Sequence, residues 1–512
     1  MSACRKGGEA VDLPAVYLTH ALAELIVIRP LTAGSVMAVS VLREPLPHVA
    51  CGIDDVVSAD GVGLVAVLRI EAAGLGVHAA PGARSYLVVH IAPAVDIAVI
   101  LALRRAVCRS EPFGILHHAH SRASGQLRKV ILAQPIDAGT RDEAEHEQGM
   151  AHFVEHLIFK GTEKRKAWHI LNRMENVGGD LNAYTNKEET VVYSAFLTEH
   201  LERALELLGD IVFHSTFPQH EIEKETEVII DEIQSYEDTP SELIFDDFED
   251  MIFRNHPLGR NILGKPELLR SFRTEDVLSF TRRFYQPGNM VFFVQGQYDF
   301  RRIIRLAEKY LSDVPAGEVN SRCVPPPLYV PEHLTVAKDT HQAHVMIGSR
   351  GYNAYDDKRT ALYLLNNILG GPGMNSKLNV SLRERRGLVY NVESNLTSYT
   401  DTGAFCIYFG TDVEDMDTCL KLTYKELKRM RDTKMTSSQL AAAKKQLIGQ
   451  IGVASDNFEN NALGMAKTYL HYHKYESSEL VFKRIEALTA EQLLEVSNEM
   501  FAEEYLSTLI YK

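Results

Sequence analysis

Two histidines and a glutamate within five consecutive residues, His152, Glu155 and His156, have the spacing of a metal site. On an α-helix, residues four apart lie on the same face, so both imidazoles can bind one ion. Glu155 would lie beside the metal, where its carboxylate can take a proton from water. A zinc ion (Zn2+) with three protein ligands keeps a position for that water and lowers its pKa to about 7. The pattern indicates zinc-assisted hydrolysis, although so short a motif also occurs by chance in many helices.

A third ligand must come from another part of the chain, and hydrolytic zinc sites commonly use a carboxylate. The acidic segment 221–238 is predicted to be helical and offers several. Glu225 and Glu232 are seven residues apart, about two helical turns, and share a partly apolar face with Val228 and Ile229. A carboxylate on such a face needs a cation or a metal-bound histidine as its partner. Spacing alone does not decide between Glu225 and Glu232.

These residues belong to the first of two segments that share one order of predicted elements. The first segment has a helix over 149–159, β-like stretches over 178–197 and helices from residue 199 onward. The second has a helix over 358–369, β-like stretches over 387–412 and helices from residue 413 onward. Thr436 and Gln439 form a predicted capping box at the start of one of these helices. The fold class is therefore predicted as α+β, with two homologous α/β sandwich domains in which helices pack on one face of a largely antiparallel sheet.

The chain is predicted to have four parts. Residues 1–110, which contain Lys6 as their only lysine, form an unassigned N-terminal extension. An extra domain, a disordered extension and a translation artefact are its open interpretations. Residues 111–314 form the zinc-binding peptidase domain, and residues 335–512 form the second domain. Between them, the prolines of 315–334 exclude regular helix and favour an extended linker.

Composition limits the possible partners and surroundings of the chain. A net charge of -14 argues against nucleic-acid binding, because a phosphate partner requires a basic face. The six cysteines include no CxxC pair, which indicates neither a disulfide framework nor a thiolate zinc site. The N-terminus lacks a secretory signal, and the apolar window 88–107 is interrupted by charges and a proline, so no membrane span is expected. A soluble, cytoplasmic protein is predicted. Two other groups of histidines are predicted to be ordinary surface or packing residues. One is His117, His118 and His120, and the other is His471 with His473.

The run DAGTRDEAEHEQGMAHFVEHLIFKGTEKR, followed by MENVGGDLNAYTNKEETVVYSAF, resembles the inverted-zincin peptidases of the pitrilysin and mitochondrial processing peptidase family. The likeness is strongest to the short bacterial members and extends from about residue 113 to the C-terminus. It implies that His152 and His156 bind zinc and that Glu155 is the general base. Glu232 matches the family's third ligand, and Glu225 matches a carboxylate that supports a ligand histidine. The segment 113–139 is expected to supply the two strands that precede the zinc helix.

The resemblance also implies how a substrate is held. The family binds its substrate as an added strand on a sheet edge, which recognises the backbone and therefore suits unfolded peptides. The residues that match this edge are Asn182, Ala183, Tyr184 and Thr185.

In the second half, LRERRGLVY resembles the family's Arg/Tyr element. Arg383 and Tyr390 are accordingly expected to reach into the active site of the first half and to stabilise the oxyanion of the transition state. Family members of this length form half of a chamber. A homodimer, or a heterodimer with a related subunit, is therefore expected.

The predicted function is a zinc metalloendopeptidase that hydrolyses peptides or unfolded polypeptide segments. The alternative is a non-catalytic partner subunit of a heteromeric peptidase. Such subunits usually lack parts of the zinc motif, so the complete set of His152, Glu155, His156 and Glu232 argues against it. A small-molecule lyase or hydrolase with a similar inverted motif ranks last, because those chains are much shorter and have no second half.

Overall fold

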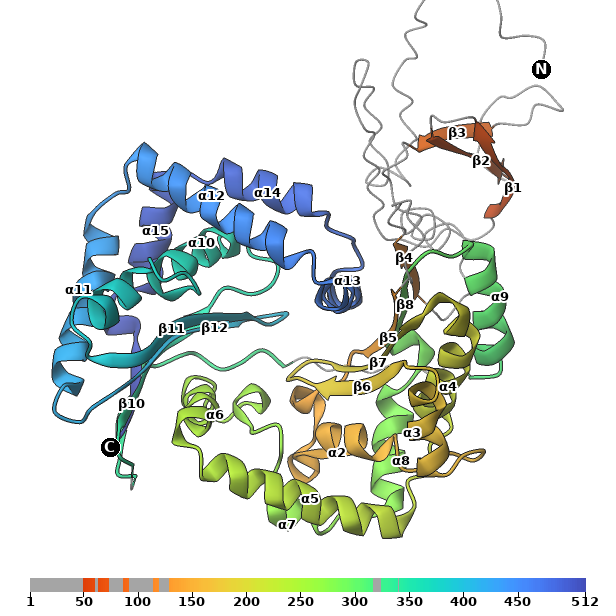
Figure 1. The fold of residues 1–512 in the computed structure, drawn as a ribbon, viewed down its shortest axis with the longest axis horizontal. Coiled ribbons are helices and arrows are strands. Elements are labelled where there is room, and N and C mark those ends of the chain that lie inside the picture. The colour runs from red at the N-terminus through yellow and green to blue at the C-terminus, as the bar shows by residue number, and fades with distance from the viewer. Residues whose placement is uncertain are drawn as a thin grey trace, which may run out of the picture. The chain divides into compact units, whose positions relative to one another are not determined.

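The computed structural model describes residues 49–59, 63–72, 86–91, 114–118, 129–315, 324–338 and 340–512 (Figure 1). The chain divides into two compact units, Met1–Glu111 and Pro112–Lys512. In the first unit, three strands form an antiparallel sheet in chain order: β1 (Val49–Ala59), β2 (Gly63–Ala72) and β3 (Tyr86–Ile91). The rest of the predicted extension lies outside the described residues, and so does His120.

The second unit is built on two five-stranded sheets of the same design. The first has the order β4-β8-β5-β7-β6 and the second the order β9-β13-β10-β12-β11. The strands of the first are β4 (Gly114–His118), β5 (Lys129–Ile136), β6 (Asp180–Thr185), β7 (Thr190–Leu197) and β8 (Val291–Gln295). Those of the second are β9 (His333–Val336), β10 (Ala343–Gly351), β11 (Val389–Ser398), β12 (Gly403–Thr411) and β13 (Ser507–Tyr511).

Strand pairing shows that the two sheets correspond strand for strand. β4 pairs in parallel with β8, and β9 pairs in parallel with β13. Every other strand pair of these two sheets is antiparallel. The prediction of two α+β domains with largely antiparallel sheets is therefore confirmed. The two strands expected within 113–139 are β4 and β5, but β8 lies between them, so they do not form a hairpin.

Helices cover these sheets. Those of the first half are α2 (Met150–Leu157), α3 (Ala167–Glu175), α4 (Leu201–Phe213), α5 (Gln219–Glu237), α6 (Pro240–Ile252), α7 (Pro266–Leu269), α8 (Thr274–Phe284) and α9 (Phe300–Leu311). Those of the second are α10 (Arg359–Gly370), α11 (Met416–Asp432), α12 (Ser437–Ala454), α13 (Phe458–Tyr472), α14 (Ser478–Ala487) and α15 (Ala490–Met500). The predicted capping box begins α12, where the amide of Gln439 donates to the Thr436 hydroxyl (3.3 Å).

The central strands are buried on both faces, not on the single face expected. Side chains alternate across a strand, and Val130 and Leu132 of β5 join the core that the first-half helices form. Ile131 and Ala133 point to the opposite face and are equally buried, because α13 of the second half packs on β5 and β8 (Figure 1).

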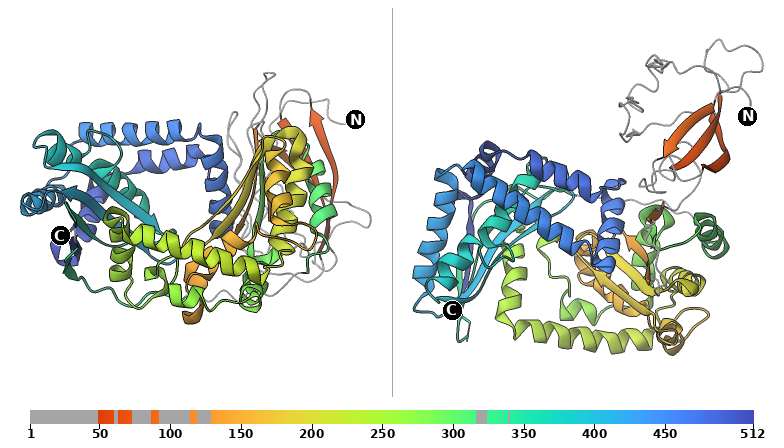
Figure 2. Two further views of the ribbon diagram at one scale, coloured as in Figure 1. Left: turned by 60° about the horizontal axis from the view of Figure 1, so that its bottom comes forward. Right: turned by 45° about the horizontal axis from the view of Figure 1, so that its top comes forward.

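Helix α6 makes the reciprocal contact, since it packs on β10, β12 and β13 of the second sheet. Ile244 and Phe248 of α6 share a buried cluster with Met346 and Tyr408 of that sheet. Figure 2 shows the yellow-green helices α5 and α6 running from the first sheet to the second. One helix of each half therefore packs on the sheet of the other half, and a smaller buried cluster joins α6 to the second sheet.

The predicted linker 315–334 is only partly described. Residues 316–323 lie outside the described residues, and residues 324–332 contain neither helix nor strand. Strand β9 begins at His333, two residues before the predicted start of the second domain. Among the described residues, no helix combines the length and apolar character that a membrane crossing requires.

Buried charges join the turn between β6 and β7 to the second half. The Arg141 guanidinium donates to Glu188 (2.6 Å) and to Asp401 (2.8 Å), and the Thr400 amide donates to Glu188 (3.0 Å). The side chains of Arg141 and Glu188 are only 6% and 10% exposed. Removal of Arg141 would leave the buried Glu188 carboxylate without this cation, whereas Arg141 would keep Asp401 if Glu188 were removed.

His471 on α13 takes part in a second charged contact between the halves. Its Nε2 lies 3.1 Å from a carboxylate oxygen of Glu189 and its Nδ1 lies 3.9 Å from Asp137, while Lys467 approaches Glu189 to 2.5 Å. Burial disfavours the charged ring, but the hydrogen bond and charge of Glu189 and the charges of Asp137 and Glu188 outweigh it and raise the pKa of His471. Burial acts to raise the pKa of Glu189 as well, yet His471 and Lys467 lower it to about 2.

Replacing His471 with Asn should destabilise the protein most below about pH 6.5. A raised folded-state pKa gives stability that is fully present below the unfolded-state value of 6.5 and is lost as the pH rises through the folded-state value. The Glu189 contribution is lost only as the pH falls below its unfolded-state value of 4.5 towards 2. The difference in free energy of unfolding between wild type and variant, measured from about pH 5.5 to 9, should shrink with rising pH. A constant difference would contradict the assignment, and His220→Asn, at an exposed position, is the control.

Candidate metal centre

Three side chains from α2 and α5 converge on one point. The Nε2 atoms of His152 and His156 each lie 3.9 Å from one carboxylate oxygen of Glu232. The imidazole centroids are 4.6 Å apart, and the ligand atoms of all three residues lie within 4.8 Å of one another. Among the described residues, this is the one group of three or more such side chains that could hold a metal ion.

The donor set fits zinc. Two ligand atoms at about 2.1 Å from one ion are at most about 4.2 Å apart, the value for a straight arrangement, so the two His–Glu distances of 3.9 Å bring these atoms close enough to approach one ion. Two imidazoles and a carboxylate are the protein ligands of many hydrolytic zinc sites. An imidazole must be neutral to bind a metal, and burial, with the charge of His156, lowers the pKa of His152 to about 3.

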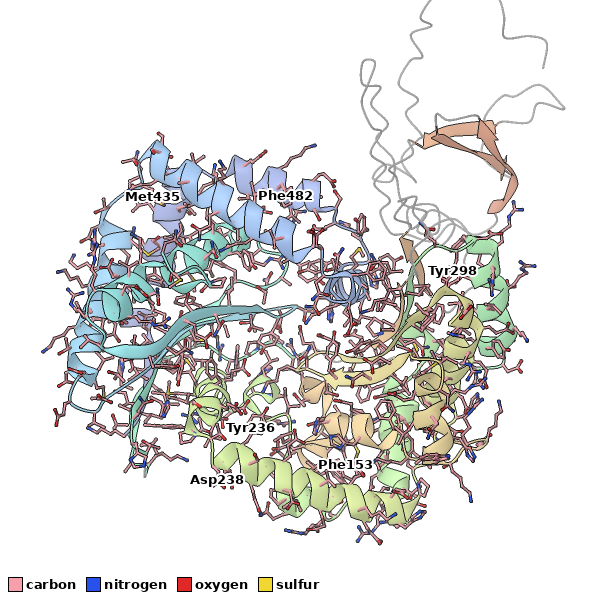
Figure 3. All side chains as sticks on the ribbon, viewed as in Figure 1. Phe153, Tyr236, Asp238, Tyr298, Met435 and Phe482 are labelled. Atoms are coloured by element: carbon pink, nitrogen blue, oxygen red, sulfur yellow. The ribbon has the colours of Figure 1, made fainter. Side chains whose placement is uncertain are left out.

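The opposite face of α2 fixes the helix in the core. Phe153 is fully buried on α2 (Figure 3). Its ring packs edge to face on Phe272 with centroids 5.5 Å apart. Val154 and Leu157 are also fully buried. The apolar residues between the histidines therefore turn the polar face of α2 towards α5, with which it is in contact.

Glu225, two turns before Glu232 on α5, supports the ring of His156. Its carboxylate lies 3.2 Å from His156 Nδ1, and its other oxygen accepts from Lys160 Nζ at 2.6 Å. Burial acts to raise the pKa of Glu225, but these hydrogen bonds and charges outweigh it and lower the pKa. Spacing left Glu225 and Glu232 unranked. In the structure Glu232 faces the Nε2 atoms of both histidines, whereas Glu225 faces the Nδ1 atom of His156.

Sequence reasoning missed Lys160. Lys160 follows His156 by four residues, as His156 follows His152. This spacing could have indicated that Lys160 lies near the histidine pair. Its ammonium group, together with the hydrogen bond to His156, lowers the pKa of Glu225.

Glu155 lies at the edge of this group and is partly exposed. Burial raises its pKa, and the Glu232 charge acts in the same direction. The polar groups of Thr185 on β6 and the charge of His156 oppose the rise. The carboxylate therefore binds a proton more readily than an ordinary glutamate, and the helix that carries it packs against β6.

Strand β6, which carries Asn182, Ala183, Tyr184 and Thr185, is the last strand of the first sheet. It pairs with β7 on one side, and no other described strand pairs with its second side. Because Thr185 contacts Glu155, the free edge of β6 begins beside the metal-site helix.

Arg383 and Tyr390 lie in the second half. Arg383 belongs to a π-helix, Asn379–Glu384, and lines a pocket of about 450 Å³ with Tyr363 and Glu393. The Tyr390 side chain is 84% exposed on β11. Within residues 129–315 and 340–512, no recorded contact joins either residue to the three metal-site side chains.

Two family models match the chain. The one described as "Insulinase (Peptidase family M16)" matches residues 121–266, and the one described as "Peptidase M16 inactive domain" matches residues 271–447. The boundary between the two matched regions lies before α8. It comes earlier in the chain than the boundary between the two structural halves, because β8 and α9 still belong to the first half.

Several similar bacterial proteins are described as uncharacterized zinc proteases. One of Bacillus subtilis is 32% identical over 384 residues, which are 75% of this chain and 93% of the relative. One of Rickettsia felis is 34% identical over 376 residues, 73% and 90% of the two chains. One of Mycobacterium tuberculosis is 30% identical over 418 residues, 77% and 93% of the two chains.

Solved structures show the same fold. The peptidase M16 inactive domain from Pseudomonas fluorescens superposes with a TM-score of 0.72 at 20% identity, covering 78% of this chain and 95% of that one. A protease from Helicobacter pylori gives a TM-score of 0.69 at 22% identity, covering 75% and 94%.

Replacing Glu225 with Gln should weaken zinc binding about 10- to 100-fold, because residues that orient a metal ligand typically contribute this much to affinity. The dissociation constant can be measured by competition with a chromophoric chelator. Glu227→Gln, on the same helix with a side chain that is 67% exposed, is the matched control. Equal affinities for the two variants would show that Glu225 does not support the site.

Proposed function

Because the chain belongs to the M16 family of metallopeptidases, we propose that it is a zinc metalloendopeptidase that hydrolyses peptides or unfolded polypeptide segments. The convergence of His152, His156 and Glu232, with Glu155 beside them, is the observation that supports the proposal most directly. His152 and His156 would bind the ion through Nε2, and Glu232 through its carboxylate. Zinc in such a site supplies Lewis acidity, which polarises a carbonyl and makes water more acidic.

Glu155 acts as the general base. Its carboxylate takes a proton from the attacking water and gives it to the leaving amine, so one group serves both halves of amide hydrolysis. A raised pKa suits this exchange, because a carboxyl with an ordinary pKa is too weak a base to hold the proton near neutral pH. The polar groups of Thr185 limit the rise, so the carboxyl can still give up the proton.

The substrate binds in an extended form along β6. A strand added to a free sheet edge is recognised through its backbone, so Asn182 to Thr185 would accept many sequences. The contact between Thr185 and Glu155 would bring the scissile bond of such a strand to the general base. Folded proteins offer few unpaired strands, which favours peptides and unfolded segments.

The second half contributes Arg383 and Tyr390, which would hold the substrate carbonyl and stabilise the oxyanion. Both are exposed and therefore available to a substrate or to a second chain. A second subunit, identical or related, would close over the β6 edge and complete the chamber. Gel filtration should accordingly show a dimer of the purified chain if the second subunit is identical, and a dimer only after the related subunit is added if it is not.

A non-catalytic partner subunit is the second candidate. It is favoured by the description of the family model over residues 271–447 as an inactive domain. Gel filtration combined with metal analysis distinguishes the two. A zinc-free protein that supports cleavage only in a mixed complex would be a partner subunit, whereas a zinc-bound protein active by itself is a peptidase.

Glu155→Gln should keep one zinc ion per chain but lose cleavage by about 10²- to 10⁴-fold, the usual contribution of general acid–base catalysis. His152→Ala and His156→Ala should lose both the metal and the activity. Mass spectrometry of a digested peptide mixture, with and without a chelator, measures cleavage and its specificity. Glu163→Gln, at an exposed position beyond α2, is the control. Full activity of Glu155→Gln would rule out the mechanism.

Arg383→Ala should lower kcat about 10²- to 10³-fold, the cost of removing one oxyanion donor, with zinc affinity unchanged. Tyr390→Phe should act in the same direction. Arg385→Ala is the matched control, because Arg385 is an exposed arginine at the end of the same π-helix. If Arg383→Ala cleaves peptides as fast as Arg385→Ala, the second half has no part in the chemistry.

A further inference from the structure

The two ligand histidines are held in different ways. The His156 ring is fixed through its Nδ1, which lies 3.2 Å from Glu225. Among the described residues, the buried Nδ1 of His152 has no hydrogen-bond partner. No polar side chain therefore orients the His152 ring, whose position depends on the backbone of the first turn of α2.

That first turn has no cap from its own N-cap residue. The N-cap is Gly149, which has φ 94° and no side chain. The first recorded intrahelical bond runs from the Phe153 amide to the Gly149 carbonyl (2.9 Å), so the amides before Phe153 need other acceptors.

Glu143 supplies two of these acceptors. One carboxylate oxygen accepts from the Gly149 amide at 3.0 Å and the other from the Ala151 amide at 2.8 Å. Ala151 directly precedes His152. The carboxylate also suits the positive end of the helix dipole, and it reaches the helix from six and eight residues away along the chain.

Glu143 is itself held firmly. Glu143 is 4% exposed, and its backbone carbonyl oxygen accepts a hydrogen bond from the Arg260 guanidinium at 2.7 Å. The backbone of Gly264 packs so closely on the turn before α2 that a Cβ at Gly264 would lie 2.4 Å from the Gln148 oxygen. Burial raises the pKa of Glu143 to about 8, although the amides of Ala151 and Gly149 act in the opposite direction. Its hold on the helix therefore rests on hydrogen bonds and packing.

We propose that Glu143 is a positioning residue of the metal centre, which fixes His152 by holding the first turn of α2. The inference rests on the proposed zinc site and adds a residue that the His–Glu motif does not contain. One ligand is then oriented through its ring by Glu225, and the other through its backbone by Glu143. Loss of Glu143 should free the turn that carries His152 and leave His156 and Glu232 in place.

Glu147 provides a matched control. It lies in the same segment and is also buried (6% exposed). Its carboxylate accepts from Arg283 at 2.6 and 2.7 Å and from the Ala144 amide at 3.0 Å, and its recorded bonds within the described residues include none to α2. Removing Glu147 deletes a buried carboxylate of equal size without releasing the first turn of the zinc helix.

The experiment compares Glu143→Ala, Glu143→Gln and Glu147→Ala in the full chain. The zinc dissociation constant is measured by chelator competition, and thermal unfolding is followed with and without zinc. We expect Glu143→Ala to weaken zinc binding about 10- to 100-fold, as for other residues that orient metal ligands. Glu143→Gln, which keeps one carbonyl acceptor, should lie between wild type and Glu143→Ala. Glu147→Ala should lower the unfolding temperature but leave zinc affinity unchanged.

Each other outcome is decisive. If wild type binds zinc and Glu143→Ala binds it equally well, Glu143 does not position the centre, while the proposed function stands. If Glu143→Ala and Glu147→Ala weaken binding equally, the effect is general loosening of the fold and the inference is wrong. If wild type binds no zinc, the proposed function fails and the inference fails with it. Should Glu143→Ala not fold, Glu143→Gln decides by the same comparison.

Discussion

The candidate site depends on the contact between two helices, because the three side chains that could hold a metal ion come from both. Glu232 on α5 meets the Nε2 atoms of His152 and His156 on α2 at 3.9 Å. The carboxylate and the two imidazoles can bind one metal ion together only while the two helices keep their relative position to within a few tenths of an ångström. Much of the fold can be understood as the means of fixing α5 against α2.

The second half contributes to that fixation without supplying a metal-binding side chain. Helix α5 leads through a short turn into α6, whose apolar face is buried on the second sheet. The hydroxyl of Tyr399 from the second half donates to Glu249 of α6 at 2.8 Å, and Arg350 donates to the Ile252 carbonyl at 2.8 Å. Helix α13 covers the first sheet in return. The duplicated fold thus ties the helix of Glu232 to both sheets, so the second half supports the metal centre structurally.

The zinc helix, the acidic helix and the repeated order of elements could be predicted from the sequence, because each rests on local periodicity and spacing. The roles of Glu225 and Glu232 could not be separated by spacing, since both lie on one stripe and only the direction of approach of α2 distinguishes them. The sequence predicted helices in the regions of α6 and α13, but it carried no information that each would pack on the sheet of the other half. The pairing of β4 and β5 with the distant β8, and not with each other, likewise depends on contacts that no local pattern records.

Carboxylates around the zinc helix show how similar groups acquire different properties. Glu225 and Glu155 are both partly desolvated, which by itself raises the pKa of each. Lys160 and His156 more than compensate at Glu225, so that carboxylate stays charged and can hold the His156 ring. At Glu155, burial and the nearby charge of Glu232 outweigh the opposing effects of Thr185 and His156, so its pKa remains raised. A supporting group must not exchange its proton, whereas a general base must exchange it at every turnover. The hydrogen bonds of His156 and Lys160 to Glu225 are therefore what separates the pKa values of the two carboxyl groups.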